Sequence, residues 1–355
     1  MNIFLSPILR FHAPAETAII GHGPPPQTPA HGMTATLRFL ARRLLFAAAL
    51  VLGVSAIVFF LVNAIGNPIA MLVAGQPNAT EDQIAALTAY YHLDQPAGAR
   101  YLAWLERLAH LDLGSSITTN QPVGEMLLVW GAETLKLQIP AIFLGLALAI
   151  LAACLAASRI NSRTDLGIVS ASLLGQSIPV FLTGIILILV FAYWLGILPS
   201  YGAYSLRGSR WGSPLLDTLW HMILPVAMLT SFHAATFTLM LRANLAETLR
   251  QDYIAAARAS GLPEYRILFS HALRNAIMPV LTYLGIAFGL MLATAPVTET
   301  VFTWPGLGVL YVTAIMQLDY PVIMGVTVVV ATMLVTATLL TDIAYVALDP
   351  RIKLT

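Results

Sequence analysis

The sequence predicts an all-α integral membrane protein with six transmembrane helices. Of its 355 residues, 58% are hydrophobic and only 10% are charged, which leaves too little polar surface for a water-soluble domain. Six apolar windows are each long enough to cross a bilayer, which takes about 20 residues in a helix. These windows are approximately 44–65, 134–157, 167–195, 219–241, 277–298 and 321–346.

Residues 1–36 precede the first transmembrane helix, which is predicted over 37–65. The first 32 residues contain no apolar run long enough for a span or a signal peptide, and they are rich in proline. We expect a disordered extension, or a start placed too far upstream of Met33, where a basic and then apolar segment opens. The prolines are Pro7, Pro14, Pro24, Pro25, Pro26 and Pro29.

The charges are balanced, with 18 Lys and Arg against 17 Asp and Glu, so no nucleic-acid partner is expected. Their placement predicts orientation, because cytoplasmic loops are enriched in basic residues. Both termini are therefore expected in the cytoplasm. The basic residues expected on the cytoplasmic side are Arg38, Arg42, Arg43, Arg159, Arg163, Arg242, Arg250, Arg258, Arg266, Arg274, Arg351 and Lys353. Those expected on the opposite side are Arg100, Arg107, Arg207 and Arg210.

Residues 66–132 form a predicted extracytoplasmic helical segment. Thr80 and Gln83 fit a capping box that opens a helix to about Tyr91, and Pro96 precedes a second amphipathic stretch at 100–110. These helices either cap the bundle or offer a docking surface to an external protein.

Residues 133–346 form the predicted core, and 347–355 form a cytoplasmic tail. Charged residues within a bilayer suggest function, but each one here has a simpler interpretation. Glu133 and Lys136 lie near the outer boundary and can reach headgroups, whereas Asp342 can pair with a loop arginine. His221 and His233 are expected to be hydrogen-bonded packing residues, and the single cysteine, Cys154, a buried hydrophobe.

The residues of the loop at 243–276 predict two short helices separated by a break. Residues 252–260 are strong helix formers, Gly261 suits a left-handed position after the helix, and Pro263 stands where a new helix begins. A connector between two spans needs few residues, so this length indicates a contact with another protein. The alternative is an amphipathic helix lying on the bilayer.

This loop resembles the EAA loop of ABC-importer permeases, and its form DYxxxARAxGL…HALRNAxxP is similar to the dipeptide/oligopeptide (peptide/nickel) permease subfamily. Other motifs of that subfamily follow in the expected order over residues 37–355. They are GNP at 66–68, LDQP at 93–96, RYLAWL at 100–105, DLG at 112–114, SIPVF at 177–181, LPSYG at 198–202, HMILP at 221–225, ETVFTWPGLG at 299–308, DYP at 319–321 and DPRIKL at 349–354.

The resemblance implies a type I ABC importer permease fold in the plasma (bacterial inner) membrane, forming a translocation pathway for peptides or similar small solutes. It also implies a second homologous permease, ABC ATPase subunits that hydrolyse ATP, an extracytoplasmic solute-binding protein and surrounding lipid. This chain would bind no cofactor. The coupling-loop residues would be Tyr253, Ala255, Ala256, Arg258, Gly261, Pro263, Arg266, His271, Arg274 and Asn275.

Three positions depart from the family pattern. Ala255 replaces the glutamate of the EAA motif, Asn67 replaces an aspartate, and Leu273-Arg274 stands where the general motif has Leu-Pro. Without that glutamate, docking is expected to depend on shape, on Tyr253 and on Arg258.

An external gate is expected at Glu299, Phe302, Trp304, Pro305 and Gly306, because a Gly/Pro break lets non-helical backbone line a cavity. The sequence has no G-x-x-x-x-G-K-[ST] motif and no catalytic constellation, so neither an ATPase nor a membrane enzyme is expected.

The alternative from another class is a stand-alone secondary transporter or channel, although the internal repeats typical of secondary transporters are not evident. A neighbouring gene for a P-loop ATPase would separate these hypotheses. The substrate stays open among peptides, nickel complexes, glutathione and oligosaccharides.

Overall fold

The computed structural model describes residues 33–66, 69, 80–205, 208–209 and 212–348. The predicted extension up to residue 32, Asn67 and the tail from residue 349 lie outside the described residues. The first helix, α1 (Met33–Ile65), already begins at Met33 rather than at residue 37.

Five described helices are long and apolar enough to cross a membrane, and a bent helix pair makes a sixth candidate. Five of the predicted windows are therefore confirmed as long helices. They are α1 (Met33–Ile65), α5 (Val123–Ala157), α8 (Pro214–Thr248), α12 (Met278–Val301) and α14 (Tyr320–Leu348).

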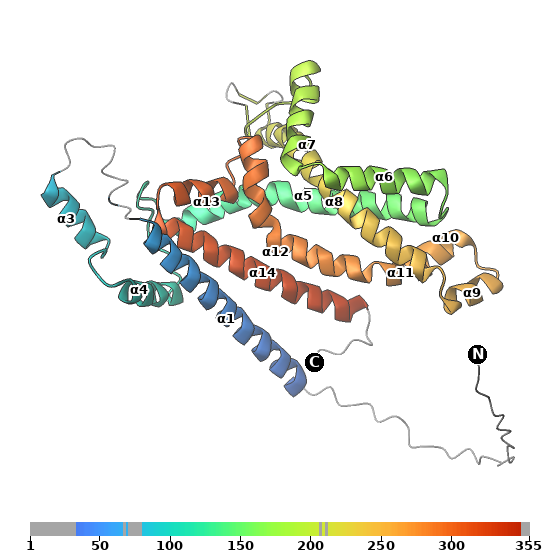
Figure 1. Cartoon of the computed structure of the whole chain (residues 1–355), viewed down its shortest axis with the longest axis horizontal. Coiled ribbons are helices and arrows are strands. Elements are labelled where there is room, and N and C mark those ends of the chain that lie inside the picture. Colours follow the sequence, from blue (N-terminus) through green and yellow to red (C-terminus); the bar gives the residue numbers. More distant parts are fainter. Residues whose placement is uncertain (1–32, 67–68, 70–79, 206–207, 210–211, 349–355) are drawn as a thin grey trace, which may run out of the picture.

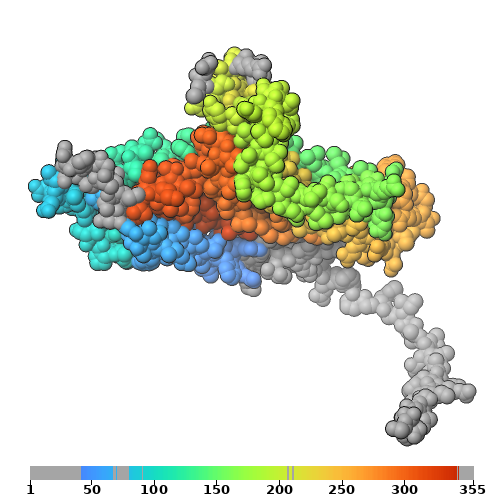
Figure 2. All heavy atoms as spheres, turned by 45° about the horizontal axis from the view of Figure 1, so that its top comes forward, coloured from blue at the N-terminus to red at the C-terminus, as the bar shows by residue number. Residues whose placement is uncertain are grey.

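The third window, predicted as one helix over 167–195, is broken into two arms. α6 (Arg163–Ser177) ends before Pro179, and α7 (Val180–Leu187) continues through the wide π turn η1 (Ile188–Trp194) at an angle of 99° to α6. Proline disfavours helical geometry in the residue before it, and Ile178 is accordingly extended, with φ −78° and ψ 125°. Figure 2 shows the α7–η1 arm rising from the elongated body.

The long helices form one elongated bundle (Figure 1). α5 packs most extensively against α8, α6 lies along both, and α12 packs against α14, with α1 on the outer side of α14. The short helices gather at the two ends of the bundle. One end carries α3 (Glu81–Tyr90), α4 (Ala97–Ala109) and α13 (Leu307–Met316), and the other carries α9 (Asp252–Ala259), α10 (Glu264–Arg266), η2 (Ile267–Ala272) and α11 (Leu273–Ala276).

Small residues bring α5 and α8 together. Ala141, Ala149 and Ala153 of α5 are fully buried, and a Cβ built at Gly145 would lie 2.6 Å from His233 Cβ. Close backbone approach through small residues is the usual way in which membrane helices associate. Cys154 is a free, buried thiol in the same interface, as expected.

Large apolar side chains remain on the outside of the bundle. Leu44, Leu45 and Phe46 of α1 are each more than 60% exposed, and Leu151 of α5 is 64% exposed. Such a surface would not remain in water, so it is the face that lipid or another subunit covers.

The segment between α1 and α5 has hydrogen bonds that define the start of α3 and its final loop. The predicted capping box is confirmed, since Thr80 Oγ1 accepts from Gln83 N at 3.4 Å and Gln83 Oε1 accepts from Thr80 N at 3.1 Å. The loop before α5 is held by Asp319, whose buried carboxylate accepts from Ser116 Oγ at 2.5 Å and from Ile117 N at 3.1 Å.

Candidate functional site

α9, α10, η2 and α11 form a bent unit, the elbow, whose turn is a Schellman motif. Gly261 N donates to the Arg258 carbonyl at 3.0 Å, and Leu262 N donates to the Ala257 carbonyl at 3.3 Å. Gly261 has a φ of +76°, so its predicted left-handed conformation is confirmed. A Cβ here would meet no heavy atom within 4 Å, so the backbone conformation alone favours glycine.

The second arm of the elbow starts directly after Pro263, which is the N-cap of α10. It continues through η2 and α11 into α12, so the second helix expected from the sequence is present but contains a wide π turn. That turn was not predicted, because no single residue in the stretch indicates it.

An ion pair joins the two arms across the turn. Arg258 Nε donates to Glu264 Oε1 at 2.7 Å, and Arg258 Nη2 donates to Glu264 Oε2 at 3.3 Å. The hydrogen bond from Arg258 holds the pKa of Glu264 below its ordinary value, and the same bond raises the pKa of Arg258. Their side chains are 45% and 69% exposed, so the pair adds little stability, but it restrains the angle of the elbow.

The inner side of the elbow is buried against the end of α8. Ile254, Ile267 and Ala272 have no exposed surface, and they cluster with Leu241 and Leu245. The elbow is therefore packed against α8 and is not a loosely attached loop.

The predicted coupling residues lie on the outer side of the elbow. All are exposed except His271, which is half-buried. Tyr253 is 43% exposed, and its hydroxyl accepts a hydrogen bond from Asn275 Nδ2 at 2.8 Å. This hydrogen bond joins α9, the first arm, to α11 in the second arm. Ala255 and Ala256 are exposed and have small side chains, so the surface between the larger side chains is shallow there. The structure thus brings these residues onto one accessible unit, and their role in coupling stays a prediction.

The predicted gate residues also come together, but inside the protein. Glu299 is 1% exposed near the end of α12 and accepts from Thr134 Oγ1 of α5 at 2.6 Å and from Val309 N of α13 at 2.9 Å. A Cβ built at Gly306 would lie 2.1 Å from Glu299 Oε1. Gly306 is therefore the residue that makes room for the carboxylate.

The turn between α12 and α13 is packed around this carboxylate. Trp304, which is 1% exposed, donates from Nε1 to the Glu133 carbonyl at 3.1 Å, and Phe302 is 2% exposed. Pro305 is half-buried. These contacts join α5, α12 and α13 into one unit, and the gate role stays a prediction.

Three of the other ionisable residues singled out from the sequence, Glu133, Lys136 and His221, have local partners. Lys136 Nζ lies 2.6 Å from Glu133 Oε1, so these two pair with each other. His221 Nδ1 lies 2.8 Å from the Asp217 carbonyl, so this histidine is hydrogen-bonded as expected. His233 is buried and its ring stacks on Phe237 with centroids 5.9 Å apart, but its Nδ1 has no hydrogen-bond partner among the described residues, so the hydrogen bond expected there is not found. The side chain of Asp342 lies outside the described residues. Among the residues described, no group of three or more His, Cys, Asp or Glu is placed to hold a metal ion.

Sequence reasoning missed two buried acidic residues. Asp165, at the start of α6, pairs with Arg242 of α8, and Asp217 accepts from Ser205 N at 2.7 Å and from Ser205 Oγ at 2.8 Å. A signal existed for the first, because Ser162 caps α6 by accepting from Asp165 N, the Ser-x-x-Asp pattern of a helix start.

Comparison with known proteins places this chain in a family. It matches the binding-protein-dependent transport system inner membrane component family over residues 135–354, and the N-terminal domain of such membrane components over residues 36–125. The chain belongs to this family. It is accordingly a membrane permease subunit, in agreement with the resemblance seen in its motifs.

Individual relatives match along almost their whole length. The oligopeptide transport system permease protein AppB of Bacillus subtilis is 36% identical over 317 residues, covering 89% of this chain and 99% of the relative. The di/tripeptide transport system permease protein DppB of Pseudomonas aeruginosa is 36% identical over 333 residues, with the same coverage. The dipeptide transport system permease protein DppB of Escherichia coli K12 is 35% identical over 336 residues, again covering 89% and 99%.

One solved structure, a crystal structure of an amino acid ABC transporter with histidines, matches with a TM-score of 0.48 and 16% identity. It covers 64% of this chain and 95% of the matched chain.

Proposed function

We propose that this permease forms, with a second homologous permease, the translocation pathway of an ATP-driven importer for peptides or similar small solutes. The observation that carries the proposal is the elbow, which has an exposed outer side and a buried inner side packed on α8. Peptide transport is supported by the names of relatives that transport oligopeptides, dipeptides and tripeptides.

Separate ATPase subunits would drive the movement through the elbow. Ala255 carries no carboxylate, and the guanidinium of Arg258 is already held by Glu264. Docking would then depend on the low alanine surface and on Tyr253. Because the inner side of the elbow packs on α8, a shift of the elbow would be transmitted to that helix as rigid-body motion.

Both termini would be cytoplasmic, with α3 and α4 on the outer side, where an extracytoplasmic binding protein delivers the solute. The positions of the arginines support this orientation. The elbow and the N-terminal end of α1 would then share the cytoplasmic side.

The turn at 302–306 would act as part of the external gate. This role is supported by the hydrogen bonds of Glu299 to Thr134 of α5 and to Val309 of α13. When α12 moves relative to α5, these hydrogen bonds either break or move the bonded residues with α12. The buried carboxylate would accordingly be a positioning group that keeps the turn closed in the resting protein.

Reconstitution of the permease with its sister permease, ATPase subunits and binding protein tests the function. ATP-dependent uptake of a labelled oligopeptide is expected only when all subunits are present. Uptake by this chain alone in liposomes would contradict the importer proposal. If the cognate binding protein retained only a non-peptide ligand, the peptide assignment alone would be wrong.

A further inference from the structure

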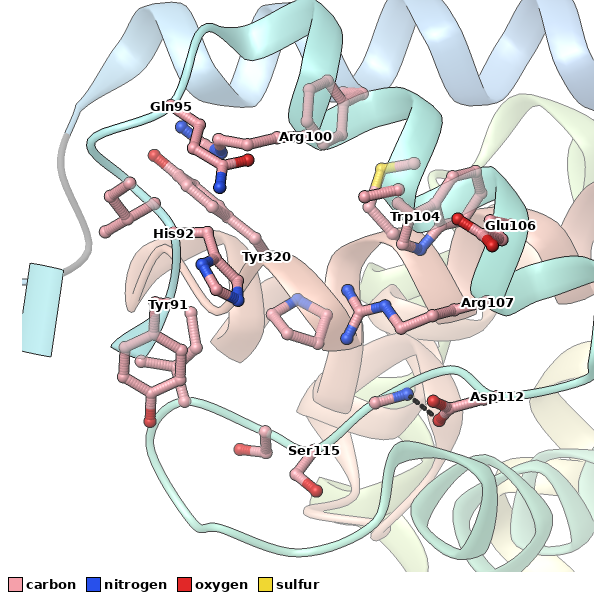
Figure 3. Close-up of a pocket in the computed structure, with 18 of the residues that line it drawn as sticks. Tyr91, His92, Gln95, Arg100, Trp104, Glu106, Arg107, Asp112, Ser115 and Tyr320 are labelled. Carbon is pink, nitrogen blue, oxygen red and sulfur yellow. Dashed lines mark hydrogen bonds between the residues drawn. The ribbon is translucent and has the colours of Figure 1, made fainter. Parts of the chain in front are cut away.

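A polar pocket of about 670 Å³ lies between α4, the first turn of α14 and the neighbouring segments of the chain (Figure 3). Its wall contains Arg100 and Arg107 from α4, His92 and Gln95 from the preceding loop, and Tyr320 from α14. The pocket plays no part in the elbow or in the turn at 302–306.

Arg107 brings to this pocket a positive charge that has no ion-pair partner among the described residues. Its guanidinium lies beside the backbone of Gly114, where a built Cβ would be 3.4 Å from Nη1. No hydrogen bond or ion pair to the Arg107 guanidinium occurs within the part of the chain that is described. A guanidinium has five donors, so this one is available to a ligand.

Arg100 has only neutral partners among the described residues. Its Nη2 donates to Asn63 Oδ1, and its guanidinium lies 5.8 Å from the ring centroids of both Phe59 and Tyr320. Burial lowers the pKa of Arg100, as expected for a cation partly removed from water without a counter-ion. An anion in the pocket would compensate this charge.

Trp104 supplies a third donor. It is 4% exposed and lines the pocket, and its Nε1 has no acceptor among the described groups. A buried indole N–H is ordinarily hydrogen-bonded, so this one lacks an acceptor that a bound ligand would supply.

The same pocket has acidic and apolar walls. Glu106 and Asp112 line it, and Asp112 Oδ1 accepts from Gly114 N at 2.8 Å. Phe59, Trp104 and Met324 form a buried apolar cluster that also lines it. A ligand that fits all three kinds of surface carries a negative group, a positive group and hydrocarbon.

The pocket borders an aromatic and apolar surface of the kind found at the membrane–water interface. Phe59, Phe60, Tyr101 and Trp104 form an aromatic cluster there, with neighbouring ring centroids 5.3–5.9 Å apart. Phe60 is 48% exposed and Leu102 is 66% exposed, so apolar surface continues outward from the cluster. Aromatic belts and amphipathic helices with such surfaces occur where the headgroups begin.

We propose that this pocket binds the phosphodiester of a zwitterionic phospholipid headgroup, with Arg100, Arg107 and Trp104 Nε1 around the phosphate. The headgroup ammonium lies toward Glu106 and Asp112, and the acyl chains leave along the apolar surface of α1 and α4. With the orientation given under the proposed function, this headgroup belongs to the outer leaflet, and only that assignment rests on the proposed function.

Native mass spectrometry of the assembled, delipidated transporter titrated with phosphatidylethanolamine tests this site. Arg107→Ala is expected to weaken retention of one lipid on the order of tenfold or more, because a charge-assisted hydrogen bond is lost. Arg159→Ala, an exposed arginine in the turn after α5, is the matched control and is expected to retain it. If Arg107→Ala fails to assemble, Arg107→Gln replaces it with the same expectation.

Competing ligands distinguish the source of the anion. Diacylglycerol, which lacks the phosphate, is expected to bind at least tenfold more weakly. Equal retention by Arg107→Ala and the unaltered transporter would overturn the proposal. So would binding of inorganic phosphate, or of an acidic peptide, as tight as that of the lipid. Lipid retention is measured without substrate or ATP, so a failure here leaves the uptake experiment unaffected, and the reverse also holds.

Discussion

Asp165 of α6 and Arg242 of α8 form a bidentate ion pair. Arg242 Nε donates to Asp165 Oδ1 at 2.9 Å, and Arg242 Nη2 donates to Asp165 Oδ2 at 2.6 Å. The Asp165 side chain is 4% exposed, and it also accepts from Asn161 N at 2.9 Å. The pair therefore joins the first arm of the broken span to the helix that leads into the elbow.

Asp165→Asn is expected to destabilise the transporter by about 2 kcal/mol. Removing one partner of a buried pair leaves the other charge uncompensated, but Arg242 is 25% exposed and water recovers part of the loss. Thermal unfolding of the assembled transporter measures the change. In a double-mutant cycle with Arg242→Gln, the double variant should cost less than the sum of the two single variants. Strict additivity would show that the pair contributes nothing.

Gly261→Val is expected to reduce ATP-dependent uptake at least several-fold, while the protein still inserts in the membrane. The left-handed conformation costs a β-branched residue on the order of 1–2 kcal/mol, and relieving that strain shifts the elbow. Vesicle uptake and ATP hydrolysis, measured together, check this.

Gly261→Asn is the matched control for the elbow. Asparagine tolerates the left-handed conformation, and the space around this position accepts a Cβ, so near-normal uptake is expected. Normal uptake by Gly261→Val would remove the proposed role of the turn.

Glu264 is expected to titrate below its ordinary pKa of 4.5 in the intact protein, because Arg258 donates to it. Its contribution to stability is present above that ordinary value and is lost as the pH falls through the lower, folded value. Both side chains are exposed, so the contribution is small. In Arg258→Ala, the carbon-13 chemical shift of the Glu264 carboxyl should report a midpoint returned toward 4.5. An unchanged midpoint would show that the pair does not persist in solution.

Local sequence signals were sufficient to predict most of the helices. Apolar windows located the five long helices, and the Thr80 capping box and the Gly261 turn followed from their own residues. The break at Ile178 was missed because hydropathy averaged over a window does not register one residue that precedes a proline. The wide turn η2 was missed because its residues are compatible with an ordinary helix.

Contacts between residues far apart in the chain could not be predicted from the sequence. The pairing of Asp165 with Arg242, and of Glu299 with Thr134, joins residues far apart in the chain. The composition of each segment gives no sign of these partners. The coupling residues came from the family resemblance, and they are exposed on the elbow apart from the half-buried His271, whereas the burial of Trp304 depends on how α5 packs across the turn.

Gly306→Ala is expected to destabilise the protein by roughly 1–3 kcal/mol, the usual cost of overpacking a filled interior. The new methyl would collide with the Glu299 carboxylate, whose carbon Cδ lies 2.2 Å from the built Cβ and whose oxygens are held by Thr134 and Val309. Thermal unfolding of the assembled transporter measures this loss.

Gly131→Ala provides the matched control for Gly306→Ala, since a Cβ at Gly131 in α5 meets no heavy atom within 4 Å, and it should leave the unfolding midpoint unchanged or slightly higher. If the collision is the cause, Glu299→Ala in the Gly306→Ala background will cost less than the two changes summed, because the methyl then occupies the space that the carboxylate has left. Equal stability of Gly306→Ala and Gly131→Ala would mean that the carboxylate moves aside freely. In that case Glu299 would not hold the turn, and the gate proposal would lose its physical basis.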